Sequence, residues 1–323
     1  MKYGRIPGLD KEVSRIILGT ASQAFFTGSG SSEILDAAKA AGINTIDTAR
    51  NYGASERWIG QWLKERGCRE EMIILSKCGH PDGDGRRRVN EREIREDFAE
   101  SSRLLGTDHI DIYLLHRDDP DIDAGVAVEV FNAMRAEGKI GVFGGSNWTW
   151  ERIEEANEYA YKHGLAPFSV SSPHFGLARQ QQDPWGGGCV TLTGAENADA
   201  RAWYVRTDMP VVAYSSLGRG VLSGKLKSAD IERAGELLDP FAMKGYGCAD
   251  NFDRLARCEE LAAKKNCSVA QLAMAWIYHQ PLNVFAVATM SSERRIRENI
   301  EALDIALTEE ECRYLNLEQR RIE

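Results

Sequence analysis

Eight short apolar runs, most of them rich in β-branched residues, recur along the chain and are separated by segments with helical spacing. The runs lie at 16–18, 43–46, 72–75, 110–115, 140–143, 168–170, 211–213 and 284–287. Runs this short and apolar on both faces are typical of parallel strands covered on both sides, although their pattern alone does not separate them from buried helix. The intervening segments decide the matter, because Val126, Val130 and Met134 share one helical face, as do Ile94 and Phe98. Strand therefore alternates with helix.

Eight such units over 323 residues favour an α/β fold of the (β/α)8 TIM barrel type, which needs about 250 residues, over an open sheet. No change in composition marks a second domain, so residues 1–323 are expected to form a single domain. The remaining length falls mainly in segments 178–207 and 217–250, predicted to be long loops on the C-terminal face. After Leu307, the sequence Thr-Glu-Glu-Glu predicts a capped helix and thus a C-terminal helical tail.

The charge and cysteine content exclude several classes of protein. Lys and Arg number 40 against 49 Asp and Glu, and the net charge of -9 has the wrong sign for attraction to nucleic acid or anionic membranes. The seven cysteines contain no Cys-x-x-Cys pair, so neither a disulfide framework nor a bound metal is expected. The N-terminus has no apolar signal segment, and no apolar run approaches the length of a membrane span. These features predict a cytoplasmic protein without nucleic-acid or membrane partners.

Four proton-handling side chains lie just after three consecutive predicted strands. Asp47 and Tyr52 follow the second strand, Lys77 follows the third, and His116 closes the fourth. Active sites of such barrels lie at the carboxyl ends of the strands, so these side chains are expected to converge on one rim. Each has a simpler interpretation by itself. Asp47 could be a turn cap and Tyr52 a packing residue, while Lys77 could be a solvated charge and His116 a core histidine. Their occurrence together favours a site.

Such a set is suited to acid catalysis by a phenol. A tyrosine has a pKa of about 10, too high for efficient proton donation at neutral pH. A lysine charge at about 4 Å and an effective dielectric near 20 supplies on the order of 4 kcal/mol to the phenolate, so Lys77 is expected to lower the pKa of Tyr52. Asp47 would hold Lys77 in place, and a neutral His116 would donate a hydrogen bond to a substrate oxygen.

Four segments and two strand ends of the sequence together resemble the aldo-keto reductases, in the family's order and spacing. They are Asp-Thr-Ala-Arg-Asn-Tyr-Gly at 47–53, the strand ends at Lys77 and His116, Gly-Gly-Ser-Asn at 144–147, the segment 213–225 and Arg-Ile-Arg-Glu-Asn at 295–299. The resemblance spans the chain and implies a TIM barrel that binds NADPH without a Rossmann domain. It also implies carbonyl reduction by a tetrad whose four positions are filled here by Asp47, Tyr52, Lys77 and His116.

The resemblance further implies a set of nucleotide contacts. Ser146 and Asn147 match residues that hold the nicotinamide carboxamide, and Tyr214 matches the aromatic residue that stacks on its ring. Ser171 stands where the family usually has Gln. The implied cofactor-binding residues are Gly19, Thr20, Asp47, Ser146, Asn147, Ser171, Tyr214, Ser215, Leu217, Gly218, Arg219, Ser291, Arg295, Glu298 and Asn299. The implied substrate contacts are Tyr52, His116 and Trp148.

The adenosine end bears on the choice between NADPH and NADH. Arg295 matches the family's arginine for the 2′-phosphate, but Thr289 stands where a second cation is often found. Ser291, Ser292 or Arg294 would have to replace the contact that a second cation makes with the 2′-phosphate. NADPH is therefore the expected cofactor, with NADH as the alternative.

Two further features concern the substrate. The loop 80–88 carries three consecutive arginines, which indicate either recognition of a phosphate or carboxylate or, as charge runs usually do, a solvated surface. Trp185 lies in the segment 178–207 and is predicted either to line the substrate site or to pack within a lid. The identity of the substrate, the physiological direction and the oligomeric state do not follow from the sequence.

The main functional hypothesis is reduction of an aldehyde or ketone, including carbonyls derived from sugars, with the same site able to oxidise alcohols. Two alternatives belong to other classes. One is a nicotinamide-binding regulatory subunit, since the fold also resembles ion-channel β-subunits. The other is a metal-dependent hydrolase using His116, Asp118 and Asp119, which the scarcity of histidine disfavours.

Overall fold

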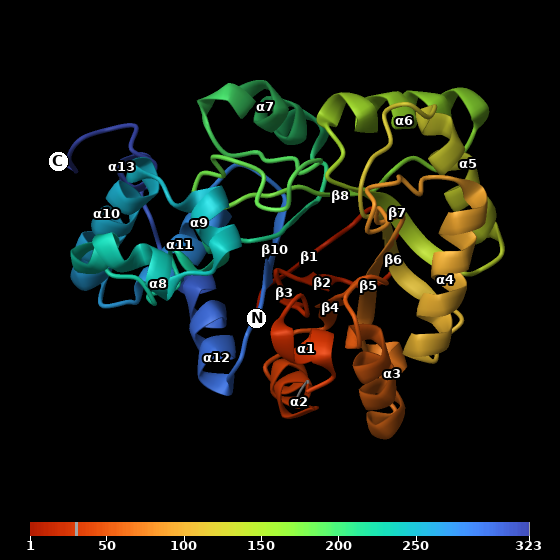
Figure 1. Ribbon diagram of the computed structural model, residues 1–323, viewed down its shortest axis with the longest axis horizontal. Coiled ribbons are helices and arrows are strands. Elements are labelled where there is room, and N and C mark those ends of the chain that lie inside the picture. Colours follow the sequence, from red (N-terminus) through yellow and green to blue (C-terminus); the bar gives the residue numbers. More distant parts are fainter. Residues whose placement is uncertain (30–31, 323) are drawn as a thin grey trace.

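The structure, a computed structural model that describes residues 1–29 and 32–322, contains eight parallel strands closed into a barrel in the spatial order β10-β3-β4-β5-β6-β7-β8-β9 (Figure 1). The predicted (β/α)8 barrel is thus confirmed. The strands are β3 (Ile16–Gly19), β4 (Thr45–Asp47), β5 (Ile73–Cys78), β6 (Ile110–Leu115), β7 (Ile140–Ser146), β8 (Val170–Ser172), β9 (Val211–Ala213) and β10 (Val284–Ala288).

Three strands begin one or two residues later than the apolar runs that predicted them. Ile43, Met72 and Phe168 precede β4, β5 and β8, yet all three side chains are buried. They belong to the turns that lead into the barrel, where burial does not require strand pairing. The apolar pattern therefore reports the extent of the core and places strand boundaries only approximately.

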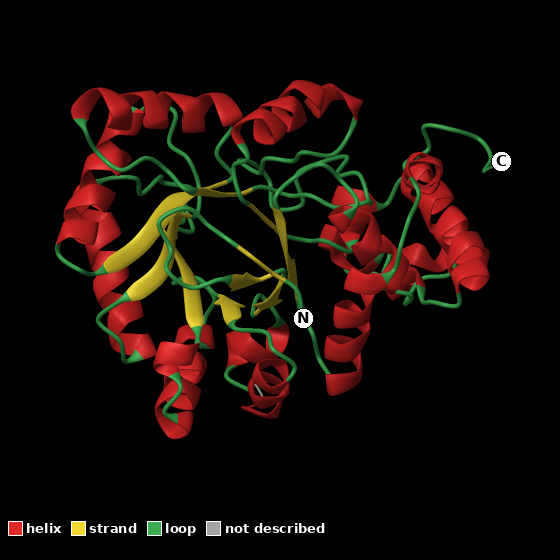
Figure 2. Cartoon of the chain, turned by 180° about the vertical axis from the view of Figure 1, so that it is seen from behind, coloured by secondary structure: helices red, strands yellow, loops and turns green. Residues whose placement is uncertain are grey.

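Helices surround the barrel, as Figure 2 shows in red around the yellow strands. The predicted face of the helix after β5 is buried at Ile94 and Phe98, and Asn90 caps that helix by accepting a hydrogen bond from the Glu93 amide. The helices are α1 (Gln23–Thr27), α2 (Ser32–Ala40), α3 (Ser55–Arg66), α4 (Glu91–Leu105), α5 (Ala124–Ala136), α6 (Trp150–His163), α7 (Ala198–Thr207), α8 (Ala234–Leu237), α9 (Pro240–Tyr246), α10 (Ala249–Lys265), α11 (Val269–Tyr278), α12 (Glu293–Glu301) and α13 (Glu309–Leu315).

Alternate residues of each strand fill the barrel interior. This layer consists of Ile17, Ile73, Leu75, Ile112, Leu114, Val142, Val170, Val212 and Phe285, and it is continuous with Ile6 and Val13. Val13 belongs to the antiparallel pair β1 (Tyr3–Gly4) and β2 (Val13–Ser14), which precedes the barrel. Because side chains alternate along a strand, Lys77 shares the inner face with Leu75, and Ser146 shares it with Val142. The same alternation brings polar side chains into the lumen at the carboxyl ends of the strands.

The two segments predicted to be long loops are partly helical, which corrects the prediction. The segment 178–207 ends in α7, and 217–250 contains α8, α9 and the start of α10. In the second segment, Asp239 caps α9 with its side chain, and Pro240 occupies the first helical turn. Helices of four to seven residues make too few turns to produce a recognisable apolar period, so the sequence pattern did not reveal them.

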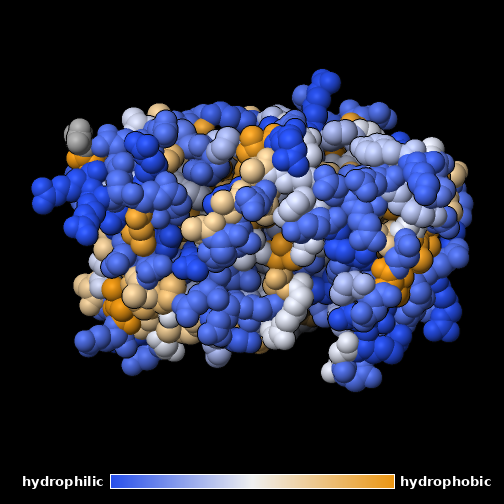
Figure 3. All heavy atoms as spheres, turned by 90° about the horizontal axis from the view of Figure 1, so that it is seen from above, coloured by the Kyte–Doolittle hydropathy of each residue, from blue (hydrophilic) through white to orange (hydrophobic). Residues whose placement is uncertain are grey.

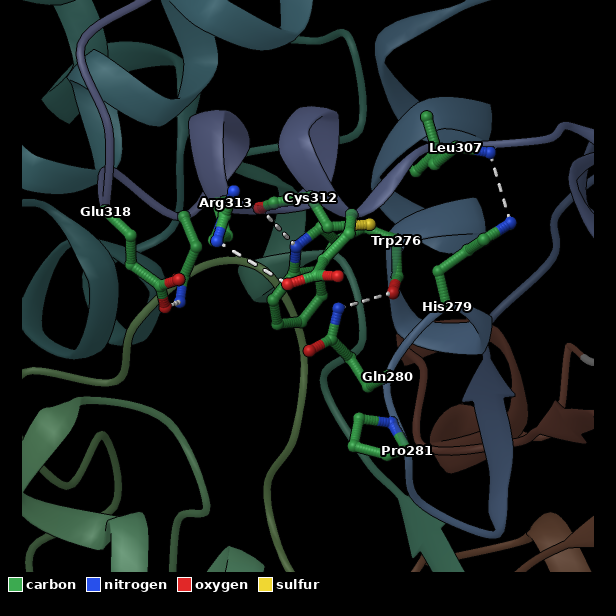
Figure 4. Close-up of a pocket in the computed structure, with 10 residues that line it drawn as sticks. Trp276, His279, Gln280, Pro281, Leu307, Cys312, Arg313 and Glu318 are labelled. Atoms are coloured by element: carbon green, nitrogen blue, oxygen red, sulfur yellow. Dashed lines mark hydrogen bonds and ion pairs between the residues drawn. The ribbon is translucent and has the colours of Figure 1, made fainter.

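The predicted helical tail is present as α13, and Thr308 and Glu311 form the capping box at its start. The tail is joined to α11 by hydrogen bonds from Trp276 Nε1 to the Cys312 carbonyl and from the Leu307 amide to His279 Nε2, both 3.1 Å. These residues border a cavity of about 370 Å³ (Figure 4). Since α11 leads into the start of β10, this cavity lies near the amino ends of the strands and away from the rim where barrel active sites form.

The surface on the face drawn in Figure 3 is mainly hydrophilic, with apolar residues in small separate groups. None of the helices in the described ranges combines the length and the apolar character that a bilayer crossing requires.

Candidate active site

The four predicted catalytic residues meet at the carboxyl ends of β4, β5 and β6. Asp47, Lys77 and His116 are buried, with exposures of 4%, 4% and 6%. The Lys77 ammonium hydrogen-bonds the Asp47 carboxylate and donates to the Thr48 carbonyl at 2.9 Å. The Tyr52 ring centre lies 5.2 Å from Lys77 Nζ and 5.6 Å from the His116 ring centre. The convergence expected from the sequence is therefore present.

Buried hydroxyl groups fix the segment that carries Asp47 and Tyr52. The Thr20 hydroxyl donates to the Asp47 carbonyl at 2.8 Å, Ser55 donates to Thr20 at 2.7 Å, and Thr48 lies 2.9 Å from Ser55. Gly53 follows Tyr52 with a φ of +57°, and a Cβ there would lie 2.5 Å from the Phe26 carbonyl oxygen. Only glycine fits this turn without displacing the backbone, which explains the residue after the tyrosine.

The Asp47 and Lys77 charges are mutually dependent. Burial alone would lower the pKa of Lys77, but the charges of Asp47 and Tyr52 together with their hydrogen bonds raise it overall. Burial raises the pKa of Asp47, and the Lys77 ammonium opposes this effect. Lys77 therefore keeps its proton at neutral pH, as the pairing with Asp47 predicts.

The expected lowering of the Tyr52 pKa is not found. Burial has the largest influence and raises the pKa of Tyr52, while the Lys77 charge and its hydrogen bond act against it. The loss of solvent around the phenol outweighs the effect of the Lys77 charge. Tyr52 is therefore a protonated phenol at neutral pH, with a lysine charge placed to stabilise the phenolate once the proton leaves.

His116 is held neutral. Burial and then the charge of Lys77 lower the pKa of His116 well below its ordinary value. Its Nδ1 is buried without a hydrogen-bond partner among the described residues, and its ring centre lies 4.9 Å from that of His80. A neutral imidazole has one N–H to donate, which is the state expected of a residue that orients a substrate oxygen.

A buried carboxyl behind the catalytic strand was not identified from the sequence. Glu56 on α3 is 1% exposed and accepts a hydrogen bond from the Ser76 hydroxyl at 2.6 Å, next to Lys77 along β5. Burial, acting against the hydrogen bond from Ser76, raises the pKa of Glu56 to about 7. The run Ser-Glu-Arg gave no sign of this, because an acidic residue in the first turn of a helix is usually a solvated cap.

Asn147 links the predicted catalytic residues to Tyr214. Its side-chain amide donates to the His116 carbonyl at 3.3 Å and to Ser146 Oγ at 3.0 Å. Its oxygen accepts from the Tyr214 hydroxyl at 2.7 Å and from the Val190 amide at 3.2 Å. Ser146, Asn147 and Tyr214 thus lie together at the barrel mouth, next to His116, which is where the nicotinamide contacts were expected.

Two predicted contacts need correction. Ser171 is fully buried and its hydroxyl lies 2.7 Å from the Tyr204 hydroxyl of α7, outside the barrel. Because Val170 faces the interior, strand alternation turns Ser171 outward and gives the inner face to Ser172. Trp148, predicted to contact the substrate, is 1% exposed and packs against Phe168, with ring centres 5.2 Å apart. Its indole belongs to the core.

The segment predicted to wrap the pyrophosphate forms a tight turn. Gly218 has a φ of +57°, and a Cβ there would lie 2.6 Å from that of Ala178. Arg219 is held by Asp239 at 3.2 Å, and its guanidinium lies over the rings of Trp185 and Phe241 at 5.3 and 5.6 Å. Trp185, for which two roles were open, thus packs on this turn while 41% of its surface stays exposed. The predicted contacts Ser215 and Leu217 lie in the same turn, and Gly19 and Thr20 lie at the end of β3.

The predicted adenosine contacts border a second cavity, of about 830 Å³. Arg295 and Glu298 of α12 line it together with Lys225 and Lys227, which follow β9 in sequence. Arg294 is paired with Glu298 at 2.9 Å, whereas Lys225, Lys227 and Arg295 have no carboxylate within 4.0 Å in the described part of the chain. Arg295 was the cation predicted here, and the two lysines of Lys-Leu-Lys at 225–227 were not predicted. Of the other predicted contacts, Ser291 is exposed, and Asn299 is buried and donates to the Arg295 carbonyl at 2.9 Å.

The three consecutive arginines of the loop 80–88 are engaged within the protein. Arg86 and Arg87 are exposed, as the solvated-surface interpretation expected, although both are paired with carboxylates, and Arg88 is buried. The ion pairs are Arg86 with Asp82 and Glu93 at 2.6 and 2.7 Å, Arg87 with Asp119 and Asp121 at 2.7 Å each, and Arg88 with Asp97 at 2.9 Å. The carboxylates proposed for a metal site are engaged too, since Arg152 binds Asp118 at 3.0 Å.

Acid–base groups at the carboxyl end of a closed parallel barrel define a class of protein, the barrel enzymes that move protons at this rim. Comparison with known proteins then identifies the family. Residues 15–317 match the Aldo/keto reductase family, and the chain belongs to it. The protein is accordingly an NAD(P)H-dependent oxidoreductase.

Several relatives are similar over most of their length. The chain is 31% identical to aldo-keto reductase str7 of Strobilurus tenacellus, over 86% of this chain and 78% of that protein. It is 28% identical to the norsolorinic acid reductase of Aspergillus flavus, covering 93% and 73%, and to the NADH-specific methylglyoxal reductase of Escherichia coli, covering 83% and 81%. The glycerol dehydrogenase AKR11B4 from Gluconobacter oxydans shares the fold, with a TM-score of 0.75 and 24% identity over 97% of this chain and 94% of that one.

Proposed function

We propose that this protein reduces an aldehyde or ketone to the alcohol with NADPH as the reductant and Tyr52 as the proton donor. The observation that carries the proposal is the convergence of a protonated tyrosine, a charged lysine and a neutral histidine at one buried rim. When bound, the reduced nicotinamide supplies the hydride.

The residues at the rim have complementary parts in the reaction. As the carbonyl oxygen gains negative charge, Tyr52 transfers its phenolic proton to that oxygen. The Lys77 ammonium stabilises the phenolate that remains, and Asp47 keeps Lys77 charged and in place. His116 donates its single N–H to the same oxygen and so orients the carbonyl carbon. The arrangement favours neither direction, so alcohol oxidation would use the same residues in reverse.

The residues present fit a nicotinamide nucleotide. Ser146, Asn147 and Tyr214 would hold the nicotinamide end, since they lie together beside His116. The turn at 215–219 would contact the pyrophosphate, because its glycine allows close approach of the backbone. Three cations without carboxylate partners in the described residues, Lys225, Lys227 and Arg295, would receive the adenosine phosphates.

These cations also support NADPH over NADH. A 2′-phosphate adds negative charge at the adenosine end, and Arg295 is half-buried in a cavity that contains two further lysines. Glu298, a residue that would repel a phosphate, is already paired with Arg294. The Escherichia coli relative is NADH-specific, so the proposed preference for NADPH rests on these cations and not on that relative.

The test is oxidation of NADPH and NADH over a panel of keto-sugars, aromatic aldehydes and phosphorylated aldoses. We expect turnover of at least one class, and a kcat/KM for NADPH at least tenfold above that for NADH. Binding of either nucleotide without turnover of any carbonyl would contradict the proposed reaction. Turnover with a preference for NADH would overturn only the cofactor assignment.

A further inference from the structure

Arg117, the residue after the proposed catalytic histidine, is a cation at the barrel mouth with no carboxylate partner among the described residues. Its side chain is half-buried, and it donates to the His116 carbonyl at 2.9 Å and to Cys189 Sγ at 3.6 Å. Across residues 1–29 and 32–322, no Asp or Glu oxygen lies within 4.0 Å of its guanidinium. A guanidinium has five N–H donors in a planar fork, so most of its hydrogen-bonding capacity is not used by these two contacts.

The other cations near this rim are neutralised. Arg86, Arg87 and Arg88 are paired with carboxylates as described above, Arg152 with Asp118, and Arg219 with Asp239. Lys77 is paired with Asp47. An arginine with no carboxylate is therefore unusual here, where partial burial makes an uncompensated charge costly.

Asp183 is the acidic residue whose charge Arg117 influences from the loop above, but its oxygens are occupied. One accepts from the Trp185 amide at 2.7 Å and the other from the Cys189 amide at 2.8 Å. These bonds hold the loop that brings Cys189 against Arg117. Asp183 thus shapes the surroundings of Arg117 without forming an ion pair with it.

Arg117 lies close enough to the reacting groups to act on them. After burial and the charge of Lys77, Arg117 is the next cause that lowers the pKa of His116, and it also opposes the burial that raises the pKa of Tyr52. His80, whose ring faces His116, is subject to the same charge: burial lowers the pKa of His80, and Arg117 lowers it further. Since Arg117 also donates to the His116 carbonyl, its uncompensated charge lies beside the residue expected to orient the reacting carbonyl.

We propose that the carbonyl substrate bears a carboxylate and that Arg117 binds it. This inference rests on the proposed reductase function and adds the substrate class. One fork of parallel N–H donors matches one carboxylate. A phosphate dianion would bring twice the charge to a single cation, with the Asp183 carboxylate nearby, so a carboxylate fits better. Cys189 and Gly188 would border the same position, since a Cβ on Gly188 would lie 3.5 Å from Arg117 Cδ.

The expected effect is about 10- to 100-fold in kcat/KM, as a charge-assisted hydrogen bond in a partly desolvated site provides. It should fall mainly on KM, because the carboxylate is bound equally before and during hydride transfer.

The test compares 4-carboxybenzaldehyde with its neutral methyl ester. In the wild type we expect kcat/KM for the acid to exceed that for the ester at least tenfold. Arg117→Met should lower this acid-to-ester ratio at least tenfold, and Arg117→Lys, which keeps the charge without the fork, should lower it less. The matched control Arg57→Met removes an exposed arginine of α3 and should preserve the ratio.

The outcomes separate this inference from the proposed function. Reduction of the ester with no preference for the acid would overturn the inference and leave the reductase function intact, whereas no reduction of either would contradict the function itself. A second pair of substrates, glyceraldehyde 3-phosphate and glyceraldehyde, tests the anion. If the phosphorylated aldehyde is preferred over glyceraldehyde by a larger ratio of kcat/KM than the acid over its ester, the carboxylate assignment is overturned. If Arg117→Met does not fold, inhibition of the wild type decides: benzoate should compete with the aldehyde and benzamide should not, and equal inhibition would refute the proposal.

Discussion

The proposed catalytic rim and the proposed adenosine end of this protein differ in how their charges are satisfied. At the rim, Lys77 and Asp47 are 4% exposed and bonded to each other. At the adenosine end, Lys225, Lys227 and Arg295 have no carboxylate partner in the described ranges, and both lysines are exposed. The charges at the rim are satisfied within the protein itself, and such fixed groups are what efficient electrostatic stabilisation of a transition state requires. At the proposed adenosine end, the phosphate groups of a bound nucleotide would supply the missing negative charge.

Glu56 is an exception to the satisfied charges of the rim. One of its carboxyl oxygens is buried without a hydrogen-bond partner in the described part of the chain. Burial raises the pKa of Glu56 to about 7, above its ordinary 4.5. The unfolded chain loses this proton near pH 4.5 and the fold holds it until about pH 7, so stability falls as pH rises through that interval. At 1.36 kcal/mol per pKa unit, the loss amounts to about 3 kcal/mol.

Glu56→Gln cannot ionise, so the variant should be more stable than the wild type at pH 8 by about that amount and close to it at pH 5. The free energy of unfolding at the two pH values measures this. The control Glu70→Gln, at an exposed position, should change neither value. A Glu56→Gln variant that is less stable at pH 8 would mean that the ionised carboxylate is needed, contrary to the burial argument.

Arg295→Gln tests the adenosine end. Removing a half-buried cation should weaken NADPH binding about tenfold, or about 1.4 kcal/mol, and leave the dissociation constant of NADH within threefold. Titration by quenching of tryptophan fluorescence measures both constants. Arg294→Gln is the matched control, because its guanidinium is already paired with Glu298 and should contribute less. Equal weakening of the two nucleotides would show that Arg295 does not distinguish the 2′-phosphate.

The loop 80–88 should give the smallest effect. Arg87 has a side-chain exposure of 43% and pairs with Asp119 and Asp121. Exposed ion pairs contribute up to about 1 kcal/mol, so Arg87→Gln should lower the melting temperature only slightly and keep kcat/KM within threefold for acidic and neutral aldehydes alike. A selective loss for the acidic aldehyde would reassign anion recognition from Arg117 to this loop.

The rim could be located from the sequence for a geometric reason. In a closed parallel barrel every strand ends at the same edge, and side-chain alternation fixes which residues face inward, so Lys77 and His116 follow directly from their strands. Tyr52 follows Asp47 closely in the sequence, so a short turn is enough to bring it to the same rim. These constraints are local, and the resemblance of the motifs to a known family agreed with them.

What could not be predicted depends on contacts between distant segments. Predicting that Ser171 faces outward would have required a strand register accurate to one residue. Lys225 and Arg295 line the same cavity because of the path of a loop, and no local pattern specifies that path. Arg117 could not be singled out from the sequence for the same reason. The chain contains many arginines, and Arg117 differs from Arg87 in the ion pairs that form only in the folded protein. The rise in the Tyr52 pKa likewise depends on how many atoms bury the phenol.

The central claim is that Tyr52 delivers the proton to the carbonyl oxygen at a rim that is already organised. The direct test is single-turnover oxidation of bound NADPH by a substrate aldehyde in the wild type, in Tyr52→Phe and in the control Tyr161→Phe, whose ring is exposed on α6. We expect the rate to fall at least 100-fold in Tyr52→Phe, the range for loss of a general acid, with NADPH binding within threefold of the wild type and the control unchanged. An undiminished rate in Tyr52→Phe, with NADPH bound, would contradict the mechanism.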